Sequence, residues 1–134
     1  MLMVFNNQKK LKKFRLKGIK VNTKPLYFGF YGLTSLETGR IDSKVLESFV
    51  QTIKRQAKLE GGKYWFSLND CIPITQTPIG TRMGKGKGNF FKHVAFVRKG
   101  QILCELSIPD RATAFSILKK AASKLPVKAR IVTY

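Results

Sequence analysis

The stretch DSKVLESFVQTIKRQAKLEGG, residues 42–62, predicts an amphipathic helix. Asp42 is a typical N-cap residue, and Gly61-Gly62 supplies the glycine that commonly follows a last helical turn. Between them, apolar side chains recur at the three- and four-residue spacing of one helix face. They are Leu46, Phe49, Val50, Ile53 and Ala57. We therefore expect one helix whose apolar stripe packs against another layer of the protein.

A second helix and several strands are predicted around this one. The helix should begin at Pro109-Asp110 and end before Pro126. Its inner face should carry Ala114, Leu118, Ala121 and Leu125. Apolar segments predict strands at 26–33, 63–68, 91–98, 101–108 and 127–133, and Lys99-Gly100 predicts a hairpin joining the third to the fourth.

Together these elements indicate an α/β (α+β) fold. The expected architecture is a two-layer sandwich, in which two amphipathic helices cover a mostly antiparallel sheet. A chain of 134 residues is one domain by size. We assign that domain to residues 26–134 and regard residues 1–25 as a basic N-terminal arm.

The chain is strongly basic, with 26 Lys and Arg against 7 Asp and Glu and a formal net charge of +19. Solubility needs a net charge of only about 2–8, so the excess predicts a polyanionic partner. No apolar run approaches the roughly 20 residues of a membrane-spanning helix. The apolar helix stripes are explained by packing on a sheet, so RNA is favoured over an anionic membrane surface.

A long segment at residues 71–90 carries the sharpest functional signal. It contains Arg82-Met83-Gly84-Lys85-Gly86-Lys87-Gly88-Asn89. Glycine lets backbone N–H groups approach a phosphate, and lysine supplies the compensating charge. Arg82 can bind a phosphate bidentately or stack on a base. The alternative interpretation of such a stretch is a flexible, solvated linker.

Nucleotide-binding motifs and catalytic sites are not supported. A P-loop would need glycine where Thr81 stands, and a dinucleotide motif would need glycine or alanine at Asn89. The chain has a single histidine, and no acidic residue lies between Asp70 and Glu105; phosphoryl-transfer metal sites need clustered carboxylates. We therefore predict no enzyme, no metal and no cofactor.

Two other residue groups receive a structural interpretation. Cys71 and Cys104 form no CxxC pair, so both are expected to be reduced and packed. Five aromatic residues offer rings for base stacking, but their expected place on strands favours core packing. They are Tyr27, Phe28, Phe30, Tyr31 and Trp65.

The segment from Pro73-Ile74-Thr75 through Pro78 to Arg82–Asn89 resembles the signature of large-subunit ribosomal protein sixteen, the universal L-sixteen family. Phe28-Gly29-Phe30-Tyr31-Gly32-Leu33 resembles its early strand, and Gly39-Arg40-Ile41 its approach to the first helix. Lys124-Leu125-Pro126-Val127-Lys128 resembles its last helix and strand. The likeness covers residues 26–134. The family's usual Pro-Lys-Arg-Thr-Lys start is missing, so only the charge of the arm is carried over.

The resemblance implies a structural constituent of the large ribosomal subunit. Such a protein binds large-subunit rRNA near the central protuberance, contacts neighbouring ribosomal proteins and helps shape the region that receives aminoacyl-tRNA. An RNA-binding or ribosome-assembly protein outside the mature ribosome is the alternative. The RNA-binding residues would be Lys9, Lys10, Lys12, Lys13, Arg15, Lys17, Lys20, Arg40, Arg82, Met83, Gly84, Lys85, Gly86, Lys87, Gly88 and Lys92.

The expected location is the mitochondrial matrix, on the mitochondrial ribosome. The first residues are apolar and the basic residues follow, which is the reverse of a secretory signal. The arm is rich in Lys and lacks Ser, unlike a transit peptide. A divergent chain rich in Lys, Ile and Phe is then expected to be organelle-encoded. A plastid or the bacterial cytoplasm is the alternative.

Overall fold

The strands of the protein form two antiparallel sheets. In this computed structural model, which describes residues 18–20, 26–68 and 72–134, a four-stranded sheet has the order β3-β6-β1-β7. A three-stranded sheet has the order β2-β5-β4. The strands are β1 (Tyr31–Ser35), β2 (Gly39–Asp42), β3 (Lys63–Phe66), β4 (Ile72–Gln76), β5 (Asn89–Val97), β6 (Ile102–Ser107) and β7 (Ala129–Thr133).

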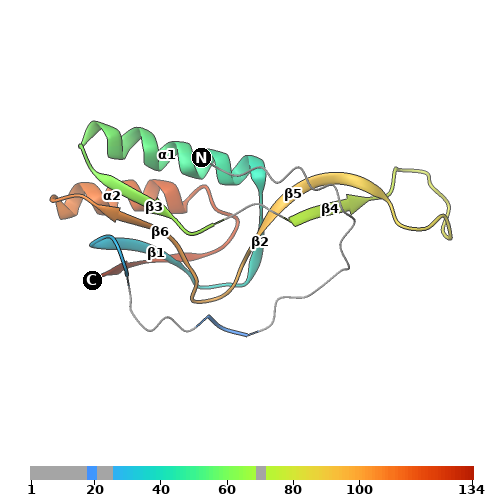
Figure 1. Ribbon diagram of the computed structural model, residues 1–134, viewed down its shortest axis with the longest axis horizontal. Coiled ribbons are helices and arrows are strands. Elements are labelled where there is room, and N and C mark those ends of the chain that lie inside the picture. Colours follow the sequence, from blue (N-terminus) through green and yellow to red (C-terminus); the bar gives the residue numbers. More distant parts are fainter. Residues whose placement is uncertain (1–17, 21–25, 69–71) are drawn as a thin grey trace.

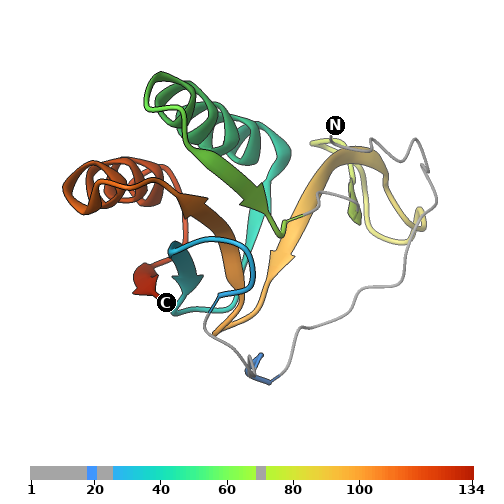
Figure 2. The same cartoon turned by 60° about the vertical axis from the view of Figure 1, so that its left-hand side comes forward.

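Two helices lie side by side along one face of the four-stranded sheet (Figures 1 and 2). They are α1 (Ser43–Leu59) and α2 (Arg111–Ala122). The α+β class, with two helices and a mostly antiparallel sheet, is confirmed, although the strands divide between two sheets. A hairpin made of β4 and β5 extends away from the helices, which makes the molecule elongated (Figure 1).

Helix α1 matches its prediction closely. Its buried residues are the five that the spacing selected, and Gly61 has a positive φ of 63° just after its end. Asp42 occupies the N-cap position, but its side chain makes no capping hydrogen bond. The carboxylate instead pairs with Lys92 of β5, whose Nζ lies 2.5 Å from Asp42 Oδ2. The start of α1 is thereby tied to the three-stranded sheet.

Helix α2 begins with a side-chain cap. The Asp110 carboxylate accepts hydrogen bonds from the backbone N–H groups of Ala112 and Thr113, which satisfies donors that a helix start leaves free. The helix ends at Ala122, one turn before Pro126, so Leu125 lies beyond it while still packing against the core. Its buried residues are Ala114, Ile117, Leu118 and Ala121.

The hydrophobic core lies between the helices and the sheet. Leu33, Cys104 and Leu106 are fully buried on the helix-facing side of β1 and β6. The ring of Phe49 in α1 meets Phe66 of β3 edge-on, at 6.1 Å between centroids. Burial of this kind is the main favourable contribution to folding, so the helices and the four-stranded sheet form the stable body of the protein.

The predicted hairpin at Lys99-Gly100 is wrong. Strand β6 lies between β3 and β1, so neither of its edges is free for β5, which pairs with β2 and β4. Residues 31–42 and 94–106 instead run antiparallel to each other through a corner between the sheets. At this corner the N–H of Gly100 donates to the Ser35 carbonyl, and the N–H of Ser35 donates to the Gln101 carbonyl.

Two other strand predictions need correction. The predicted strand at 26–33 begins only at Tyr31, and the residues before it cross the sheet as an irregular segment. Core packing is therefore wrong for Tyr27, Phe28 and Phe30, whose side chains are 60%, 68% and 60% exposed. The expected loop at 71–90 contains the missed strand β4 and the first residues of β5, so the connection itself is 77–88.

Candidate nucleic-acid interface

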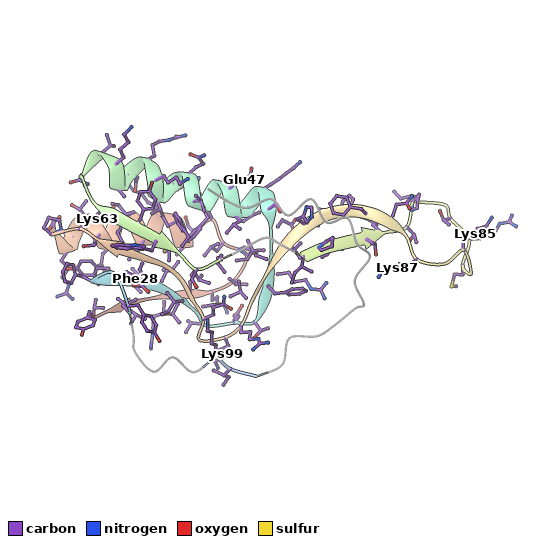
Figure 3. All side chains as sticks on the ribbon, viewed as in Figure 1. Phe28, Glu47, Lys63, Lys85, Lys87 and Lys99 are labelled. Atoms are coloured by element: carbon purple, nitrogen blue, oxygen red, sulfur yellow. The ribbon has the colours of Figure 1, made fainter. Side chains whose placement is uncertain are left out.

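The basic loop forms the tip of the β4–β5 hairpin. We define the tip loop as residues 77–88; every residue in it except the half-buried Gly88 is exposed. Figure 3 shows Lys85 and Lys87 at the end of the molecule remote from the helices, with Lys85 farthest out. Side chains in such a position bury little apolar surface, so they interact with solvent or with a partner and contribute little to the hydrophobic core.

Glycine residues determine the backbone path of the tip loop. Gly84 and Gly86 adopt positive φ values of 90° and 78°, a region that L side chains rarely enter. A Cβ atom on Gly88 would lie 2.4 Å from the Gln76 carbonyl oxygen, so only glycine allows the two arms of the hairpin to approach there. The loop encloses a concave space of about 400 Å³ that includes Arg82 and Lys85 in its lining.

Arg40 and Lys92 lie on the three-stranded sheet that carries the tip loop. The exposed Arg40 of β2 places its guanidinium 5.1 Å from the centre of the Phe96 ring. Lys92 lies 5.4 Å from the Phe91 ring, and its charge is largely matched by Asp42. The register puts Arg40 and Lys92 on the same face of the sheet. Arg40 is therefore the stronger candidate for a phosphate contact.

Those predicted RNA-binding residues that the structure describes are not brought to a single place. Lys20 is exposed at the corner between the sheets, where its N–H donates to the Lys99 carbonyl at 2.9 Å. Arg98 and Lys99 are exposed beside it and are missing from the predicted set, although the basic turn was visible in the sequence. The remaining arm residues lie outside the described residues: Lys9, Lys10, Lys12, Lys13, Arg15 and Lys17.

The acidic residues of the described part are mostly committed to internal contacts. Besides Asp42 and the capping Asp110, Glu37 lies 3.4 Å from Lys128, and Glu105 is buried. Hydrogen bonds from Thr113 lower the pKa of Asp110. Residues 72–89 contain no acidic residue, so every charged side chain of the tip loop is positive.

The same residues carry no sign of a metal site or a membrane-spanning helix. Within residues 18–20, 26–68 and 72–134, no three His, Cys, Asp or Glu side chains gather as metal ligands. No helix in this part of the chain has the length and apolar character needed to cross a membrane. Burial raises the pKa of the Cys104 thiol to about 12, so that thiol stays neutral and unreactive at physiological pH. Cys71 lies outside the described residues.

Comparison with known proteins gives a consistent result. The family model of Ribosomal protein L16p/L10e matches residues 5–132. Large ribosomal subunit protein uL16 of Corynebacterium glutamicum (strain R) is 44% identical over 115 residues, covering 86% of this chain and 83% of that protein. The uL16 protein of Mycobacterium sp. (strain KMS) is 44% identical over 119 residues, covering 89% and 86%. The chain therefore belongs to the Ribosomal protein L16p/L10e family, whose members are structural proteins of the ribosome and not enzymes.

Proposed function

We propose that this protein is a structural component of the large ribosomal subunit that binds rRNA through its tip loop. The observation that carries the proposal is the exposed run of Arg82, Lys85 and Lys87 on a glycine-shaped hairpin whose residues 72–89 include no Asp or Glu. Positive side chains and accessible backbone N–H groups suit the phosphate backbone of RNA. The relatives are named as proteins of the large ribosomal subunit, which supports the same role for this protein.

The tip loop is the part of the protein that we assign to the aminoacyl-tRNA region. It projects from a body held by its own hydrophobic core (Figure 1), so it can enter a space between RNA segments while the body remains outside. Its contribution there is charge neutralisation and shape. The arm and Arg40 are assigned to further rRNA contacts, and neighbouring ribosomal proteins are the remaining partners.

An RNA-binding or assembly protein outside the mature ribosome is the second candidate. Its basic surface would serve equally well, but family membership supports the ribosomal role. For location, the named relatives are bacterial, which fits the alternative of a bacterial cytoplasm. The mitochondrial assignment rests on the divergent, Lys-, Ile- and Phe-rich sequence and on the lack of transit-peptide features in the arm, and the named relatives do not support it. Co-sedimentation of the endogenous protein with large subunits from purified mitochondria would distinguish the two locations.

Reconstituted large subunits provide the test of the tip loop. The variant carries Arg82→Ala, Lys85→Ala and Lys87→Ala, and it should incorporate poorly or yield subunits that bind aminoacyl-tRNA weakly. A matched control removes the same charges from exposed positions of α1 through Lys44→Ala, Arg55→Ala and Lys58→Ala. We expect the control to assemble more completely. Normal assembly and tRNA binding by the tip-loop variant would show that the arm, and not this loop, carries the function.

A further inference from the structure

Aromatic side chains gather on the face of the four-stranded sheet that the helices leave uncovered. We define the aromatic patch as Tyr27, Phe28, Phe30, Trp65 and Tyr134. The Phe28 ring stacks on Trp65 at 5.8 Å with an interplanar angle of 24°. Tyr134 donates its N–H to the Phe30 carbonyl at 2.9 Å. Phe28 is 68% exposed although its ring is stacked, and Tyr134 is 82% exposed although its backbone is held by this hydrogen bond.

The exposure of these rings follows from the way the backbone beneath them is held. One oxygen of the buried Glu105 carboxylate accepts hydrogen bonds from three consecutive N–H groups, those of Tyr27, Phe28 and Gly29, at 3.1, 2.6 and 2.9 Å. A Cβ on Gly29 would lie 2.8 Å from the backbone of Leu106. Leu26 is the residue that turns inward, with 1% of its surface exposed. The segment therefore rests on β6 with its aromatic side chains facing solvent.

The charges around the patch are positive. Strand register places Trp65 opposite Glu105. Because side chains alternate between the two faces of a strand, Lys63 lies on the same face of β3 as Trp65. Arg130 of β7 is opposite Thr34 and also points to this face. Both basic residues are exposed. On the described strands of this sheet, the one acidic residue on the outward face is Glu105. Its carboxylate is already hydrogen-bonded to the backbone beneath the patch.

We propose that the aromatic patch stacks unpaired RNA bases. This inference rests on the proposed rRNA binding and adds a second contact surface to it. Flat exposed rings bind base faces, and neighbouring Lys and Arg bind the adjoining phosphates. The cationic rim favours this ligand over a protein segment, which would need acidic residues to match it. Phe28 and Lys85 lie at opposite ends of the molecule (Figure 3), so the protein joins two separate RNA segments.

The single tryptophan of the chain reports directly on this surface. The full-length protein is titrated with short oligoadenylate and with an abasic oligonucleotide of the same length, at a salt concentration that weakens phosphate contacts. Oligoadenylate should quench Trp65 fluorescence, and the abasic strand should not. Phe28→Leu retains apolar bulk but removes the ring, and should weaken oligoadenylate binding about 10-fold. Phe28→Tyr should bind as the wild type does.

A matched control is Phe91→Leu, which changes another exposed phenylalanine on the three-stranded sheet and should leave the quenching intact. Circular dichroism establishes that each variant is folded. Equal quenching by the abasic strand, or full binding by Phe28→Leu, overturns the inference; the latter result would favour an apolar protein partner. If wild-type protein fails to bind rRNA at all, the proposed function itself is wrong.

Discussion

Replacing Glu105 tests how firmly residues 27–29 are held against the sheet. Glu105→Gln removes the charge that accepts three backbone N–H groups. Hydrogen bonds to a charged group contribute more than neutral ones, so we expect the free energy of unfolding to fall by about 1–3 kcal/mol. Urea denaturation measures this change. Glu47→Gln, at an exposed position of α1, is the control and should alter stability by less than about 0.5 kcal/mol. An equal effect of the two variants would contradict the structural role of Glu105.

Cys104 predicts a pH dependence of stability. Burial, reinforced by the nearby Glu105 carboxylate, raises its pKa from 9.0 to about 12. Because the folded-state pKa is the higher one, the contribution of the neutral thiol is complete below about pH 9. It is lost as the pH rises toward 12, by at most about 1.4 kcal/mol per pH unit. Urea unfolding between pH 8 and pH 11 should show a steeper loss for wild type than for Cys104→Ala. Parallel curves would contradict the buried-thiol assignment.

At the scale of elements, the core determines stability. Leu46→Ala in α1 or Leu118→Ala in α2 should lower the free energy of unfolding by about 2–5 kcal/mol, because each removes buried apolar volume and leaves a cavity. Both side chains are at most 1% exposed. Leu59→Ala is the control at an 83% exposed position and should have little effect. Chemical denaturation of the three variants provides the comparison.

The tip loop should behave in the opposite way. Removing Arg82, Lys85 and Lys87 together should barely change the melting temperature of the free protein, because these side chains are exposed and bury little apolar surface. Differential scanning calorimetry measures the effect, with the Lys44, Arg55 and Lys58 variant as the charge-matched reference. Unfolding of the tip-loop variant at ordinary temperature would mean that the loop is structural.

Elements with a strong local pattern were predictable from sequence, and pairings between strands were not. The spacing from Leu46 to Ala57 defines α1 because a helix repeats every few residues. Lys99-Gly100 is compatible with a hairpin turn or with a corner, and the choice depends on β1 and β3 occupying the edges of β6. The exposure of Phe28 likewise depends on Glu105, which is 77 residues away. Local composition carries no information about such a contact.

The salt dependence of RNA binding is a property of the whole molecule. With a net charge of +19, rRNA affinity should fall steeply as salt rises, because each phosphate contact releases counterions. Loss of the three tip-loop charges should reduce the slope of log affinity against log salt by about 2–3. Filter binding across a salt series measures the slope. The charge-matched α1 variant should change it less, and a slope near zero for wild type would contradict phosphate binding.

The candidate site was predictable in composition but not in arrangement. The glycine and lysine run identified the tip loop because its chemistry is local to Arg82–Asn89. The distribution of the other basic residues over the corner and the three-stranded sheet depends on the sheet pairings, which no local pattern encodes. Tyr27, Phe28, Phe30 and Trp65 of the aromatic patch were assigned to the core for the same reason, since their rings resemble those of a buried strand until the Glu105 contact is known.

The position of β1 in its sheet has a consequence for biosynthesis. Both of its neighbours, β6 and β7, come from the last third of the chain. At about 5–20 residues per second, β1 waits roughly 4–15 s after its own synthesis before β6 has been made, and longer before β7. Throughout this interval the apolar face of α1 has no completed sheet to pack against. The body must therefore fold late, when nearly the whole chain has been translated, and nascent chains of this protein should depend on chaperones until then.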